Sequence, residues 1–140
     1  MTDFFHLDMA DREVGAISNL GLAHMGDAVY ELLVRAWLCT SGGVTAKGLH
    51  RAAVRYVAAP AQAQAARQIL PHLTEKEEAV YRRGRNTRVN TVPRHASLEE
   101  YHAATGLETL FGHLCLRGEL DRLNALFALA IQEGGCHHAP

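Results

Sequence analysis

Apolar residues recur every three or four positions along most of this chain, and β-branched residues nowhere gather into alternating runs. The segment 22–37 shows this spacing clearly, with apolar residues at positions 22, 25, 29, 32, 33, 36 and 37. Such spacing puts apolar side chains on one face of an α-helix, whereas a half-buried strand needs strict alternation. The chain is therefore predicted to be all-α.

Capping residues and helix breakers set the boundaries of the predicted helices. Thr74 and Ser97 are each followed three residues later by a glutamate, which is the capping-box pattern that opens a helix. Pro60 suits the first turn of a helix, and Gly84 is predicted to end one. The expected helices, joined by short connections, span residues 18–39, 45–57, 60–70, 74–83, 97–116 and 119–133.

The length and composition of the chain predict one folded domain. A chain of 140 residues fits a single compact unit. With 48% hydrophobic and 21% charged residues, it can form a core and is not a disordered tail. We expect an N-terminal segment over 1–17 that is mobile to about Val14, a helical domain over 18–133 and a flexible tail over 134–140.

The cysteines and the N-terminal sequence indicate the cellular compartment in which the protein is expected. Cys39, Cys115 and Cys136 are odd in number and show no paired spacing, so no disulfide scaffold is predicted and a reducing cytosol is favoured. The first residues are acidic and lack the basic start and apolar stretch of a signal peptide. Apolar runs fall far below the roughly 18 residues that a membrane span needs. We therefore expect a cytoplasmic protein without membrane association.

Gly26 and Asp27 interrupt an otherwise strong predicted helix. Glycine costs roughly 1 kcal/mol relative to alanine inside a helix. Aspartate is also unfavourable there, because its short side chain competes for backbone groups. Exceptions of this kind tend to mark functional sites. The alternative interpretation is a solvated polar stripe in which Glu31 pairs with Arg35, one turn further along.

Glu108 lies on a predicted helix face with small or apolar neighbours, and no lysine or arginine stands within one turn of it. A carboxylate on such a face is partly desolvated and needs a partner when it is ionised. A divalent cation shared with Asp27 would meet that need, since hard oxygen ligands suit Mg²⁺. A long-range salt bridge or a position at the rim of the domain explains Glu108 equally well.

Residues 79–98 hold five arginines and no acid. The whole chain carries −1, which argues against capture of nucleic acid by the entire surface, yet the rest of the chain carries −6. Guanidinium groups and neighbouring polar side chains suit phosphate oxygens. The alternative is a solvated face that pairs with the glutamates at 75, 77 and 78. The predicted nucleic-acid contacts are Arg82, Arg83, Arg85, Asn86, Arg88 and Arg94.

These motifs together resemble one enzyme family. The sequence LAHMGDAV at 22–29 looks like the signature helix of ribonuclease III, whose Gly-Asp supplies a metal-binding aspartate. The sequence GLETLFG at 106–112 resembles the family's second acidic helix, whose glutamate is the other metal ligand. The segments RGRN and TVP, and a short chain without an appended double-stranded-RNA-binding domain, make it similar to the Mini-ribonuclease III branch. The resemblance covers about residues 19–133.

The acidic positions of the longer ribonucleases III are only partly present. Those enzymes carry a glutamate four residues before the first aspartate and an aspartate three residues before the glutamate, where this chain has Ala23 and Thr105. The short branch is similarly reduced. The resemblance therefore implies Asp27 and Glu108 as the catalytic, metal-binding pair. Glu31, one turn from Asp27 in the predicted helix, is expected to orient a metal-bound water. The number of metal ions per site stays open.

The family also implies a fold, a cofactor and partners. The fold is an all-α ribonuclease III-type endonuclease domain of about six or seven helices, dimeric, with carboxylates flanking a valley for double-stranded RNA. Mg²⁺ is the implied cofactor, with Mn²⁺ as a substitute, and the products carry 5′-phosphates. The implied substrate is precursor 23S ribosomal RNA, cleaved with assistance from a ribosomal protein. The rival hypotheses are a non-catalytic RNA-binding or ribosome-assembly module, which the missing acids favour, and a metal phosphohydrolase acting on nucleotides.

Overall fold

A computed structural model describes residues 1–40, 45–88 and 96–135. The described part folds into seven α-helices and one short 3-10 helix, so the prediction of an all-α fold is confirmed. None of the helices within these ranges is long and apolar enough to cross a membrane. The elements are α1 (Asp11–Gly15), α2 (Asn19–Thr40), α3 (Ala46–Val57), α4 (Ala59–Ile69), η1 (Leu70–His72), α5 (Glu75–Arg85), α6 (Leu98–Leu116) and α7 (Leu120–Gly135).

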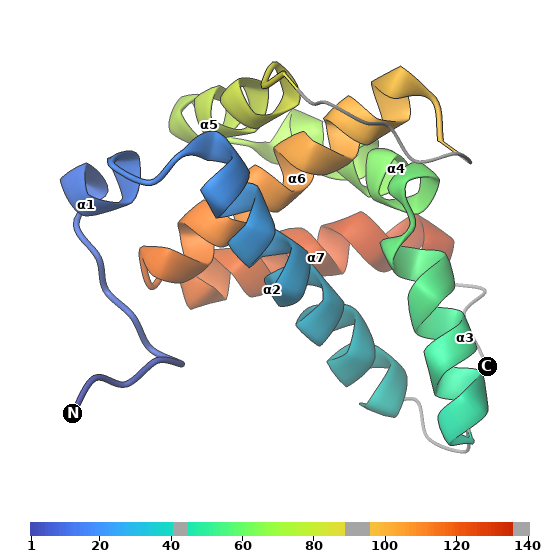
Figure 1. The fold of residues 1–140 in the computed structure, drawn as a ribbon. Coiled ribbons are helices and arrows are strands. Elements are labelled where there is room, and N and C mark those ends of the chain that lie inside the picture. Colours follow the sequence, from blue (N-terminus) through green and yellow to red (C-terminus); the bar gives the residue numbers. More distant parts are fainter. Residues whose placement is uncertain (41–44, 89–95, 136–140) are drawn as a thin grey trace.

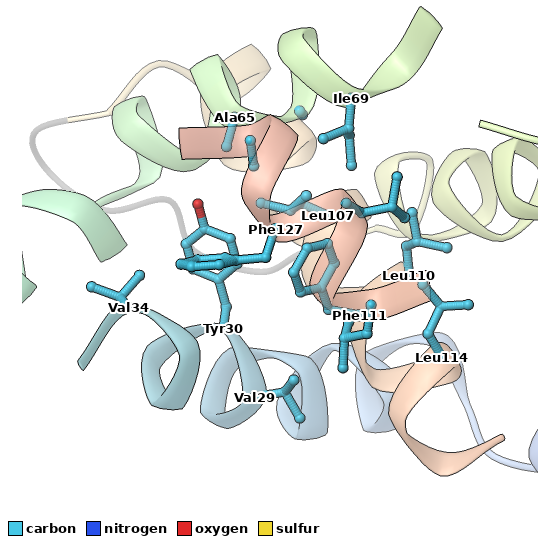
Figure 2. Close-up of a cluster of buried hydrophobic side chains, with 14 of the residues drawn as sticks. Val29, Tyr30, Val34, Ala65, Ile69, Leu107, Leu110, Phe111, Leu114 and Phe127 are labelled. Atoms are coloured by element: carbon cyan, nitrogen blue, oxygen red, sulfur yellow. The ribbon is translucent and has the colours of Figure 1, made fainter. Parts of the chain in front are cut away.

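Helix α6 runs through the middle of the molecule, and α2, α4, α5 and α7 pack around it (Figure 1). Its Leu107 and Phe111 are fully buried. The Tyr30 ring of α2 packs against Phe111 of α6 and Phe127 of α7, with ring centroids 5.3 Å and 5.6 Å away in tilted and edge-on arrangements (Figure 2). Aromatic pairs favour such geometry over face-to-face stacking. This cluster fixes how α2 lies against α6.

The predicted capping boxes are confirmed. The Thr74 hydroxyl accepts from the Glu77 backbone N–H at 3.1 Å, and the Glu77 carboxylate accepts from the Thr74 N–H at 2.9 Å. Ser97 and Glu100 repeat both bonds at 3.0 Å. Each box satisfies two backbone donors at a helix start, and α5 and α6 begin one residue after their caps.

Gly84 was predicted to end its helix, and this is wrong. Helix α5 continues to Arg85, and Asn86 is its C-cap. Gly84 is buried, and a Cβ at this position would meet the Thr109 side chain and lie 3.1 Å from the Gly106 Cα. The glycine therefore permits close approach of α5 to α6 and does not terminate a helix.

The N-terminal segment was expected to be mobile to about Val14, and this is wrong for residues 9–14. Val14 is 0% exposed and belongs to α1. The Met9 N–H donates to the Leu116 carbonyl at 3.0 Å, and the Arg117 Nη1 donates to the Met9 carbonyl at 2.6 Å. Bonds from both sides of Met9 thus tie the segment to the end of α6.

The other boundaries lie close to the predicted ones. Helices α2, α3 and α4 each begin within one residue of the expected position. Helix α7 runs to Gly135, so the first two residues of the predicted tail are helical. Residues 136–140, and residues 89–95 of the predicted loop after α5, lie outside the described residues.

Candidate active site

Helices α2 and α6 cross at two glycines. A Cβ on Gly26 would meet the carbonyl oxygen of Glu108 and lie 2.9 Å from its Cα. A Cβ on Gly112 would meet the Leu22 carbonyl and lie 3.0 Å from the Gly26 nitrogen. A side chain at either position would push the helices apart. The helix-breaking residue beside Asp27 thus has a structural reason, which is backbone contact between α2 and α6.

This crossing brings together the carboxyl groups of Asp27 and Glu108. Asp27 is exposed and Glu108 is half-buried, and a hydrogen bond joins their side chains. Burial, followed by the negative charge of Asp27, raises the pKa of Glu108 to about 8. Two adjacent carboxylates resist joint ionisation. The pair can therefore share a proton or hold a cation between its oxygens.

Gln62 of α4 is a third polar side chain at this place, and the sequence analysis did not single it out. It is 1% exposed, its Nε2 donates to the Val57 carbonyl at 3.1 Å, and its side chain hydrogen-bonds Glu108. That hydrogen bond favours the ionised form of Glu108 and partly offsets the effect of burial. A signal was present, because Gln62 shares the apolar face of its helix with Ala66 and Ile69.

No cationic side chain contributes to the pKa shift of Glu108. Within the described ranges, no three His, Cys, Asp or Glu residues are placed to hold a metal ion. Ala23 and Thr105, which stand where longer relatives were expected to carry acids, are both buried, and the Thr105 hydroxyl donates to the Tyr101 carbonyl at 3.0 Å. The acidic side chains at the crossing are therefore Asp27 and Glu108.

Glu31 lies one turn from Asp27 on α2, and its carboxylate forms an ion pair with Arg35. This is the pair that the alternative interpretation of the polar stripe expected. His24, on the preceding turn, is exposed. The stripe therefore contains a surface ion pair as well as one carboxylate of the candidate site.

The predicted RNA-contacting residues lie at and after the C-terminal end of α5. Arg82 forms an ion pair with Glu78 at 3.2 Å, as the alternative interpretation expected. Asn86 donates its backbone N–H to the Arg82 carbonyl. Arg94 lies outside the described residues. Three further arginines have exposed side chains and no acidic partner within ion-pair distance in the described part, namely Arg83, Arg85 and Arg88.

Comparison with known proteins first defines the class. The Ribonuclease III domain family matches residues 20–119, a range that includes both site carboxylates. A crystal structure of a protein from Fusobacterium nucleatum has the same fold, with a TM-score of 0.79 and 26% sequence identity. The similarity covers 87% of this chain and 98% of that one. The helical arrangement is therefore that of a ribonuclease III domain.

Curated relatives narrow the assignment. The Mini-ribonuclease 3 of Symbiobacterium thermophilum is 46% identical over 111 residues, which are 79% of this chain and 85% of that protein. The Mini-ribonuclease 3 of Enterococcus faecalis is 39% identical over 126 residues, which are 89% and 96% of the two chains. The chain belongs to the ribonuclease III family and, within it, to the Mini-ribonucleases 3. It is a ribonuclease III-type endoribonuclease, and enzymes of this family act on double-stranded RNA and generally depend on divalent metal ions.

Proposed function

We propose that this chain is a Mg²⁺-dependent endoribonuclease in which Asp27 and Glu108 are the catalytic residues and hold the metal. The observation that carries the proposal is the contact between these two carboxyl groups at the α2–α6 crossing. Glu108 is partly desolvated and has no cationic partner among the described residues, so the pair lacks positive charge. Hard carboxylate oxygens suit Mg²⁺, and Mn²⁺ prefers the same ligands.

A bound divalent cation supplies Lewis-acid activation of water and neutralises charge on the scissile phosphate. The protein's part is to hold the carboxylates in place. At the crossing, Asp27 is exposed and Glu108 is half-buried. The close contact of Gly26 with the Glu108 backbone holds the two helices, and therefore the two carboxyl groups, close together. We assign Glu31, whose carboxylate is held by Arg35, the role of orienting a water next to the site.

The phosphate backbone of the substrate is proposed to be bound by the arginines that end and follow α5. Double-stranded RNA is recognised by its shape, its phosphates and its 2′-hydroxyls, because its major groove is too narrow to read. The planar guanidinium fork matches phosphate oxygens. Since α5 packs on α6, the same helix carries Glu108 and supports these groups. The proposed contacts are Arg82, Arg83, Arg85, Asn86, Arg88 and Arg94.

A homodimer belongs to the same proposal. Helix α2 carries a row of exposed residues at every fourth position, and Leu20 and Leu32 in this row are 49% and 55% exposed. Ala28, one residue of this row, directly follows Asp27 in the sequence. A second copy packed on it would therefore bring two active sites to one RNA duplex. The members of the row are Leu20, His24, Ala28, Leu32 and Ala36.

The biological substrate proposed here is precursor 23S ribosomal RNA, processed in the cytoplasm with a ribosomal protein on the substrate assisting. The match to Mini-ribonucleases 3 over most of the chain supports this assignment. Cleavage of ribosomal precursor transcripts and of unrelated duplexes, compared with and without ribosomal proteins, would test it.

The Asp27→Asn variant tests the catalytic assignment. Replacing one carboxylate oxygen by an amide group removes a charge and a ligand without changing size, so duplex cleavage in Mg²⁺ should fall by roughly 10²-fold or more. Helix content and RNA binding should be retained. Asp8→Asn, at an exposed position away from the crossing, is the matched control and should cleave normally.

Wild-type protein assayed with EDTA completes the experiment. Undiminished cleavage by Asp27→Asn would remove the metal-site assignment. Binding of duplex RNA by the wild type, with no cleavage in Mg²⁺, would favour the non-catalytic RNA-binding module instead.

A further inference from the structure

The side-chain oxygen of Gln62 is buried and has no hydrogen-bond partner in the described part of the molecule. A buried acceptor left unsatisfied costs about 1–3 kcal/mol, and most buried polar atoms in folded proteins are paired. A leucine at this position of α4 would avoid that cost. The oxygen therefore needs an explanation, and its surroundings suggest one.

The orientation of the Gln62 amide follows from its neighbours. The Val57 carbonyl can only accept a hydrogen bond, so the amide nitrogen must face it, at 3.1 Å. The side chain also hydrogen-bonds Glu108. The amide nitrogen has two N–H groups, and an ionised Glu108 likewise only accepts, so these two acceptors use both donors. The amide oxygen is left over, on a side chain that contacts one of the two site carboxylates.

The candidate metal site is short of protein oxygens. Mg²⁺ is octahedral and takes six oxygen ligands, of which the protein usually supplies only some. Asp27 and Glu108 are the acidic groups here, and no third His, Cys, Asp or Glu joins them among the described residues. A third carboxylate would add repulsion to a pair that already resists joint ionisation. A neutral amide oxygen adds a hard ligand without adding charge.

We propose that the Gln62 Oε1 is the third protein oxygen of the divalent-cation site and that its Nε2 anchors Glu108 beside it. This inference rests on the proposed metal-dependent function. The three ligands then come from α2, α4 and α6, so cation binding joins the three helices at their meeting point.

Cation affinity in the absence of RNA tests the proposal. Binding of Mn²⁺ to the purified full-length chain can be followed by electron paramagnetic resonance. Gln62→Leu should weaken Mn²⁺ binding roughly 10- to 100-fold, the range found when groups supporting a metal site are removed. Gln62→Glu keeps an oxygen but loses the amide N–H donors that face the Val57 carbonyl and Glu108, so its Mn²⁺ affinity should lie between those of wild type and Gln62→Leu. Gln64→Leu, at an exposed position on the same helix, should bind like wild type.

Helix content and the urea midpoint without metal show whether each variant is folded. A folded Gln62→Leu that binds Mn²⁺ like wild type would overturn the proposal. If Gln62→Leu fails to fold, Gln62→Met, which keeps the length of the side chain and removes the amide, decides, and Mn²⁺ binding like that of wild type overturns the proposal as well. If the wild-type protein neither binds Mn²⁺ nor cleaves duplex RNA, the proposed function is refuted. If the wild type does both and Gln62→Leu binds Mn²⁺ with the same affinity, only the role of Gln62 is refuted.

Discussion

Replacing Gly26 by alanine adds one methyl group at the point where α2 crosses α6. Helix propensity alone predicts that the variant is more stable, since alanine is favoured over glycine by about 1 kcal/mol inside a helix. The tertiary structure predicts the opposite. The new Cβ would meet the Glu108 carbonyl oxygen and lie 2.9 Å from the Glu108 Cα, and both are backbone atoms that cannot rotate away.

The size of the effect follows from these opposing terms. Overpacking a well-filled interior costs about 1–3 kcal/mol, and a clash with backbone belongs at the upper end. Subtracting the gain in helix propensity leaves a net destabilisation of about 2 kcal/mol. Relief requires α2 and α6 to separate by on the order of 1 Å, and a misplacement of that size costs roughly 10²-fold in rate. Asp27→Asn, by contrast, should lose activity without losing stability.

Urea unfolding at a fixed protein concentration measures the free energy of unfolding, and cleavage of a short RNA duplex in Mg²⁺ measures the rate. Gly15→Ala is the matched control, because a Cβ at Gly15 meets nothing within 4 Å. It should unfold at the same or higher urea concentration and cleave normally. A Gly26→Ala protein that is as stable as wild type and fully active would refute the argument from the helix crossing.

Two further predictions concern charge. The hydrogen bonds and ion pair that Glu77 receives from Arg122 lower the pKa of Glu77 below its usual 4.5. The stabilisation is therefore present above about pH 4.5 and is lost as pH falls through the pKa of the folded protein. Glu77→Gln should cost about 2 kcal/mol of unfolding free energy at pH 7, and its difference from wild type in urea midpoint should vanish in acid. Replacing Arg83 and Arg85 by alanine should raise the KM for duplex RNA and reduce the slope of log affinity against log salt by roughly 1–2, whereas Arg12→Ala on α1 should leave it unchanged. An unreduced slope would show that these arginines do not bind the phosphates.

The sequence was most informative where structure depends on neighbouring residues. Thr74 and Ser97 each complete their capping box within four residues, so the starts of α5 and α6 could be placed without any tertiary information. The helices themselves were predictable for the same reason, because the period of their apolar residues is a local property. Glu108 was also identified locally, as a carboxylate without a cation within one turn.

Glycine shows where local signals become ambiguous. Gly84 has the position of a helix terminator in the sequence, yet it is buried against Thr109 and Gly106, and the helix continues past it. Gly26 was noticed as an exception to helix preference, but its partner, Glu108, is distant in the chain. A glycine that ends a helix and one that admits another backbone look alike until the second helix is placed.

Two other features depended on tertiary contacts. The first 14 residues are polar enough to suggest a mobile segment, but a buried Val14 and the bonds at Met9 hold residues 9–14 against the end of α6. Gln62 was overlooked because glutamine is common on exposed helix faces. Only its position in the apolar register of α4 marked it as buried, and alanines on either side weaken that register.

The arrangement of glycines has a consequence for the enzyme as a whole. Gly26 and Gly112 let α2 contact α6 through backbone atoms, and Gly84 and Gly106 let α5 approach α6 closely, with the Thr109 and Tyr81 side chains between the two helices. Asp27 on α2 and the arginines of α5 are therefore both carried by helices that pack closely against one central helix. Close-packed contacts of this kind transmit strain and do not relax freely, so the distance between the proposed metal site and the arginines of α5 is set by the fold. An RNA duplex is itself stiff, and its phosphates have a fixed spacing. A fixed distance between the arginines that bind its phosphates and the proposed metal site would therefore place the scissile bond at that site through the shape of the duplex.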